Sequence, residues 1–153
     1  MLLHQSLRPL VPLTLRFARP KAYPAQPKTL GEHLLKRRME QGLTQAQVGR
    51  ELGTDEWTVG NWEKDRTLPA VRYFPAIFRF LGYDPFPAPI TLSEKLLAKR
   101  RALGLSVKRA AAEIGVDEGT FALWERGTAQ LQKIEDAVER LGCGKSNRKN
   151  KAK

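Results

Sequence analysis

The chain has 153 residues, 41% of them hydrophobic, and a formal net charge of +11 at pH 7. This length allows one medium domain or two small ones, and the absence of any run of about 18 apolar residues excludes a membrane-spanning helix. One cysteine, Cys143, and two histidines exclude an intrachain disulfide and a Cys/His zinc site. We therefore expect a cytoplasmic protein with no metal and no other cofactor.

The positive charge lies at the two ends of the chain. Residues 1–28 and 143–153 each hold five basic residues and no acidic one, whereas residues 29–142 hold 17 basic and 16 acidic residues. Basic ends favour binding to nucleic acid, because basic residues release counterions from its phosphates. The alternative is that these ends only aid solubility.

Residues 1–28 are expected to form a flexible, basic arm because they contain five prolines, which prevent a long helix. Pro12 interrupts the only apolar patch, so no signal peptide is expected. An acid-free N-terminus with arginines is also found in transit peptides, but the prolines argue against the amphipathic helix of such a peptide. Residues 143–153 are expected to be a disordered basic tail.

The sequence between these ends repeats itself with an offset of 62 residues. Between 29–63 and 91–125, 15 of 35 positions are identical without a gap. This similarity predicts a duplicated domain, with one copy at 29–82 and the other at 91–142. The alternating prolines predict that 83–90 is a stiff, extended spacer, and the nine residues 82–90 would reach about 28 Å.

Helix start and stop signals recur in both copies. Thr44 followed by Gln47 indicates a capping box, Gly53 ends that helix, and Asp55 caps the next one. In the first copy we expect helices over 30–41, from the Thr44 cap to Gly53, from the Asp55 cap to Glu63, and over 74–81. In the second copy we expect helices over 92–103, 107–114, 118–126 and 131–141.

Two short helices joined at a glycine form a helix-turn-helix. The stretch resembles the helix-turn-helix of the lambda-repressor-like (XRE-type) family in Leu43-Thr44-Gln45, in Val48 to Gly53, in Val59 and Trp62, and in the closing Glu63. The resemblance implies an all-α fold of two repeated five-helix domains. It also implies a sequence-preferring protein that binds double-stranded DNA, of the kind found among bacterial and phage transcriptional regulators, acts at the nucleoid, and can form a homodimer.

The family's recognition helix enters the major groove, and here that helix follows Asp55. The resemblance implies that Gln45 contacts a phosphate and that Asn61 reads a base edge. Trp57 would pack on a thymine methyl or along the backbone, while Glu56 would be repelled by phosphates unless it accepts from cytosine. Two basic residues that follow this helix complete the expected DNA contacts, Lys64 and Arg66.

The second copy has Val107 and Leu123 where the first has Gln45 and Asn61. It therefore offers no base-specific donor, and we expect it mainly to support the first copy. Its expected contacts with DNA are secondary and come from three basic residues: Lys108, Arg109 and Arg126.

Two arginine–glutamate pairs stand at matching positions of the copies, and in the resembled family such a pair ties the first helix to the third. We expect ion pairs, largely buried, between Arg38 and Glu63 and between Arg100 and Glu125. The tryptophans before the glutamates, Trp62 and Trp124, are expected in the cores.

The rival hypothesis is a helix-turn-helix fold that serves as a protein-interaction module. The near-neutral middle of the chain, the acidic Glu56 and Glu118, and the apolar Leu123 favour it. No catalytic motif is present, so an enzyme is not expected.

Overall fold

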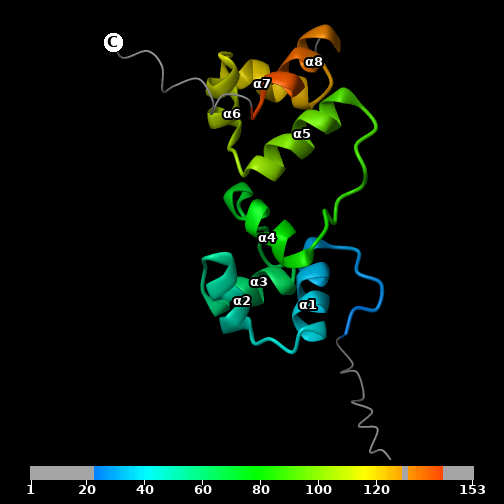
Figure 1. Cartoon of the computed structure of the whole chain (residues 1–153), viewed down its shortest axis with the longest axis vertical. Helices are drawn as coiled ribbons and strands as arrows, with labels where there is room; N and C mark the ends of the chain where they lie inside the picture. Colours follow the sequence, from blue (N-terminus) through cyan, green and yellow to red (C-terminus); the bar gives the residue numbers. More distant parts are fainter. Residues whose placement is uncertain (1–22, 129–130, 143–153) are drawn as a thin grey trace, which may run out of the picture.

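The computed structural model describes residues 23–128 and 131–142. This described part is all-helical and contains no strand, which confirms the all-α part of the prediction (Figure 1). The first half comprises α1 (Leu30–Glu40), α2 (Gln45–Leu52), α3 (Glu56–Glu63), the 3-10 helix η1 (Val71–Tyr73) and α4 (Phe74–Leu81). The second half comprises α5 (Leu92–Leu103), α6 (Val107–Ile114), α7 (Glu118–Glu125) and α8 (Leu131–Arg140).

Each half therefore has four α-helices among the described residues, and the first half also has the 3-10 helix η1. The repeated five-helix plan that the resemblance implies stays a prediction. Within the same residues, none of the helices is both long enough and apolar enough to cross a membrane.

The helix ends follow from local capping. The Thr44 side chain accepts from the Gln47 amide while Gln47 Oε1 accepts from the Thr44 amide at 2.8 Å, which is the predicted capping box. Gly53 ends α2 with φ +74°, a backbone angle that side-chain-bearing residues resist. Asp55 then caps α3 by accepting from the Thr58 amide at 2.8 Å.

Each half has its own hydrophobic core. The buried residues of the first come from α1 to α4: Leu34, Val48, Leu52, Val59, Trp62, Ile77, Phe80 and Leu81. Those of the second come from α5 to α8: Leu96, Ala110, Ala111, Ile114, Phe121, Ile134, Ala137 and Leu141. In both halves, the third helix packs against the first and second helices, so the two motifs are framed in the same way.

The two halves meet where α5 packs against α4 and η1 (Figure 1). Gly104, which follows α5, fits closely there, because a Cβ atom at this position would lie 2.9 Å from Pro75 Cγ. This contact joins the two cores through the last helix of one half and the first helix of the other.

The segment 83–90 does not hang free between the halves as an extended spacer would. The Tyr83 hydroxyl lies 2.8 Å from His33 Nδ1 on α1. The Phe86 ring packs against Phe74 at 5.8 Å between centroids, and the Arg101 guanidinium lies 4.3 Å from the Phe86 centroid. Aromatic side chains of the segment therefore contact both halves, and the predicted stiffness of the spacer stays a prediction.

The end of the N-terminal arm also lies against the fold. The Tyr23 hydroxyl donates to Glu40 Oε1 at 2.8 Å, and Lys36 Nζ donates to the Ala25 carbonyl at 3.0 Å. Residues 23–28 are thus fastened along α1, although the arm was expected to be flexible up to residue 28. The rest of the arm, 1–22, and the tail, 143–153, lie outside the described residues.

Candidate nucleic-acid interface

The turn between α2 and α3 is built on a close backbone approach. The Thr54 amide donates to the Gly49 carbonyl at 2.8 Å. A Cβ atom at Gly49 would lie only 2.9 Å from the Thr54 carbonyl oxygen, so this buried helix position requires glycine. The tight turn holds α3 across α2 and fixes which residues of α3 face outward.

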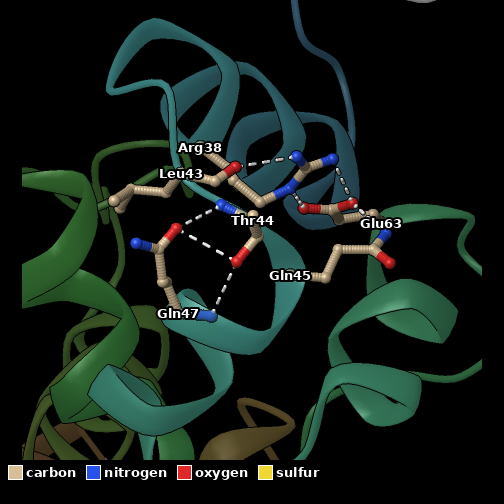
Figure 2. Close-up of polar contacts among 6 residues, drawn as sticks. All are labelled: Arg38, Leu43, Thr44, Gln45, Gln47 and Glu63. Atoms are coloured by element: carbon tan, nitrogen blue, oxygen red, sulfur yellow. Dashed lines mark hydrogen bonds and ion pairs between the residues drawn. The ribbon is translucent and has the colours of Figure 1, made fainter.

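An ion pair ties this motif to α1 (Figure 2). Arg38 Nε and Nη2 donate to Glu63 Oε1 and Oε2 at 2.5 and 2.9 Å, a bidentate arrangement. Arg38 Nη1 donates to the Leu43 carbonyl at 3.1 Å, which fixes the chain just before α2. The Glu63 side chain is only 3% exposed, so Arg38 rather than water stabilises its negative charge.

Gln45 is the second residue that binds the Glu63 carboxylate and supplies its third hydrogen-bond donor. Its Nε2 donates to Glu63 Oε2 at 2.8 Å, so the amide is held at the first residue of α2 (Figure 2). Gly60 leaves room for it, because a Cβ atom there would lie 3.3 Å from Gln45 Oε1. A primary amide has a second N–H, which the structure leaves without a partner in the described residues. An anion at the α2 N-terminus would also meet backbone N–H groups.

The beginning of α3 presents its side chains to solvent. Trp57 is 75% exposed, and Glu56 beside it is also exposed. After the helix, Lys64 and Arg66 are exposed and form no ion pair with any described residue. These four predicted residues therefore lie on accessible surface around the motif.

Asn61 lies in a different environment from the one expected. It is only 6% exposed, so its predicted place on the outer face of α3 is wrong. The reason is that α1 and α2 both pack against α3, which buries every residue from 59 to 63. A periodicity argument allows α3 one buried face, whereas two neighbouring helices cover more of its surface.

The second motif repeats the ion pair without the amide. Arg100 Nε and Nη2 donate to Glu125 Oε1 and Oε2 at 2.6 and 3.0 Å, and Nη1 donates to the Leu105 carbonyl at 3.0 Å. The position equivalent to Gln45 is Val107, which packs against the second core. The Glu125 side chain is 11% exposed, and Arg100 supplies its only two hydrogen-bond donors among the described residues.

The surface of the second motif is partly basic and partly apolar. Lys108 and Arg109 are exposed in the first turn of α6, and Arg126 is exposed just after α7. Leu123 is 47% exposed on α7. Trp124 is half-buried, whereas Trp62 is 3% exposed, so only the first tryptophan is a fully buried core residue as expected.

Two features of the first motif were not foreseen from the sequence: the bond from Gln45 to Glu63 and the room that Gly60 provides for it. A comparison of the two copies could have indicated that these two residues act together. Gln45 and Gly60 are replaced together, by Val107 and Ala122, while the arginine and glutamate are kept.

Comparison with protein families assigns the first motif. The helix-turn-helix family matches residues 34–86, about a third of the chain, and the match includes the first motif and its exposed residues. Residues 34–86 are therefore a helix-turn-helix domain of the XRE type. Comparison with curated proteins and with solved structures gave no match.

Proposed function

We propose that this chain is a sequence-preferring, double-stranded DNA-binding protein that regulates transcription at the nucleoid, not an enzyme. The observation that carries the proposal is the Gln45 amide, which Glu63 holds at the N-terminus of α2. An amide that is already oriented loses little conformational freedom when it binds, so its bond to a phosphate contributes more affinity.

In this proposal α3 enters the major groove and its first turn meets the bases. Gln45 and the backbone N–H groups of α2 bind one phosphate, while Lys64 and Arg66 bind others. Trp57 is the most exposed side chain of the helix and packs on a thymine methyl or the sugar-phosphate backbone. Glu56 accepts from cytosine N4, the usual base partner of a carboxylate in this groove.

We further propose that the second half, 91–142, is a duplicate of the first domain, 29–82. Identity at 15 of 35 positions supports this proposal, and so do the matching bonds of the two ion pairs. The capping boxes of α1 and α5 also match. Without an equivalent of Gln45, the duplicate contributes secondary phosphate contacts through Lys108, Arg109 and Arg126 and supports the first domain through α5.

The ends of the chain complete the proposal. The five basic residues in each of 1–28 and 143–153 add affinity that does not depend on DNA sequence. A homodimer would place two copies of α3 on successive half-sites of an operator.

A protein-interaction module remains the second candidate function, and one specific observation favours it. Leu123 is 47% exposed on the outer face of α7, where an apolar side chain gains more from an apolar partner than from a groove edge. Exposed Glu56 and Glu118 would also suit a basic protein partner.

The deciding experiment compares Gln45→Ala with Val107→Ala in the full chain. The DNA is a duplex selected from genomic fragments. Gln45→Ala removes a bond to a charged group, so affinity should fall by about 10-fold or more, while Val107→Ala should leave it unchanged. Urea unfolding of both variants checks that the fold is kept. A full chain that selects no duplex even at low salt would exclude DNA binding and favour the interaction module.

A further inference from the structure

After α3 the backbone turns at a non-glycine residue in the left-handed conformation. Asp65 has φ +53° and is the only non-glycine residue with positive φ in the described part of the chain. The Asp65 and Arg66 amides close the end of α3 by donating to the Trp62 and Asn61 carbonyls at 3.0 and 2.9 Å. A residue with a side chain adopts this left-handed conformation less readily than glycine does, and contacts from another helix hold Asp65 there.

Those contacts come from the start of α1. The Thr29 hydroxyl donates to Asp65 Oδ2 at 2.7 Å and accepts from the Glu32 amide at 3.1 Å, so its donor and its acceptor are both used. Gly31 allows the approach, because a Cβ atom there would lie 2.7 Å from Asp65 Oδ1 and 2.0 Å from the Trp62 carbonyl oxygen. The carboxylate thus lies over the first turn of α1, where the helix dipole favours negative charge.

The second half closes the same turn without this contact. Gly127, with φ +78°, takes the place of Asp65, and its amide donates to the Trp124 carbonyl at 3.1 Å. Ser93 takes the place of Gly31. Thr91 caps α5, but no aspartate stands at position 127 to accept a hydrogen bond from its hydroxyl. A turn of this shape therefore does not need Asp65, which suggests another role for the carboxylate.

We propose that Asp65 is a positioning residue for the DNA contacts of Lys64 and Arg66, an inference that rests on the proposed function. All three residues are exposed, but the Asp65 side chain is held by the Thr29 hydroxyl at the start of α1, whereas Lys64 and Arg66 form no ion pair with a described residue. Fixing the backbone between the two cations reduces the conformational freedom that each loses on a phosphate. The bond to Thr29 also directs the carboxylate away from the phosphates it would repel.

The test compares two variants of equal charge, Asp65→Asn and Asp65→Gly, in the full chain. Asparagine tolerates the left-handed conformation and can still accept from Thr29, whereas glycine keeps the turn but loses the contact. Hydrogen exchange at the Arg66 amide should be faster in Asp65→Gly than in Asp65→Asn. Affinity for the selected duplex should be about 2- to 10-fold lower in Asp65→Gly. The slope of log affinity against log salt should be smaller by up to about 1.8, for two lost contacts.

Thr29→Ala and Thr91→Ala form the matched control pair, since both lose a capping box and only the first loses the bond to Asp65. Faster exchange at the Arg66 amide is expected in Thr29→Ala alone. Equal exchange in the two Asp65 variants would overturn the contact itself, whatever happens with DNA. Different exchange with equal affinity and equal salt slope would overturn the positioning role. A wild-type chain that binds no duplex would overturn the proposed function, and the phosphate role with it.

Discussion

The two helix-turn-helix motifs have the same ion pair and differ in what surrounds its carboxylate. Around Glu63 the first motif places Gln45 and leaves room at Gly60, and the pair is part of a polar network that reaches the surface. Around Glu125 the second motif has only the arginine, with Val107 packed toward the core. The comparison separates two roles: the ion pair holds three helices together in both halves, and the added amide gives the first half its candidate phosphate contact.

The largest expected losses of stability come from replacing the arginine of each ion pair. Arg38→Ala leaves Glu63, 3% exposed, without its ionic partner, and should lower the free energy of unfolding by about 3–5 kcal/mol. Arg100→Ala leaves Glu125, 11% exposed, and should cost roughly half as much because water reaches that carboxylate. Urea unfolding measures both values. Equal costs would mean that the extra exposure of Glu125 has no energetic effect.

A second comparison uses two equivalent glycines to probe the contact between the halves. Gly42 and Gly104 have φ +65° and +66°, but a Cβ atom meets nothing within 4 Å at the first and Pro75 Cγ at 2.9 Å at the second. Alanine is strained at a positive φ, so both variants should lose about 1 kcal/mol of unfolding free energy for this reason alone. Gly104→Ala should cost about 1–3 kcal/mol more because it overpacks the α4–α5 contact. Thermal unfolding checks the prediction, and identical losses would show that the contact yields freely.

The smallest effect concerns pH and His33, which has no counterpart in the second half because Lys95 stands there. Partial burial, helped by the nearby Lys36 charge, lowers the pKa of His33 below its ordinary value of 6.5. The folded state then binds fewer protons than the unfolded state, so this contribution to stability is complete above pH 6.5 and is lost as pH falls. His33→Gln should reduce the fall in the urea midpoint between pH 7.5 and 5.5. If the urea midpoint of His33→Gln fell as much as that of the wild type, titratable groups other than His33 would cause the fall.

Helix boundaries could be predicted from the sequence because their causes are local. Thr44, Asp55 and Gly53 act on residues within one turn, and α6 has the predicted bounds of 107–114. The ion pairs could be predicted because the resemblance supplied partners that are 25 residues apart.

The rest depended on how the helices pack. The burial of Asn61 requires knowing that two helices cover α3, which no single stretch of sequence contains. The anchoring of Phe86 depends on an aromatic pocket formed by α4 and on Arg101 from the other half. The prolines of 83–90 carry no information on where the aromatic side chains between them bind.

The contact between α4 and α5 has a consequence for how the chain unfolds. A domain of about 50 residues buries too little surface to be more than marginally stable alone. Since α4 belongs to the first core and packs on the first helix of the second, each half contributes to the stability of the other. Heat or denaturant would then act on one cooperative unit, and a destabilising change in the second half would also lower the folded fraction of the first motif.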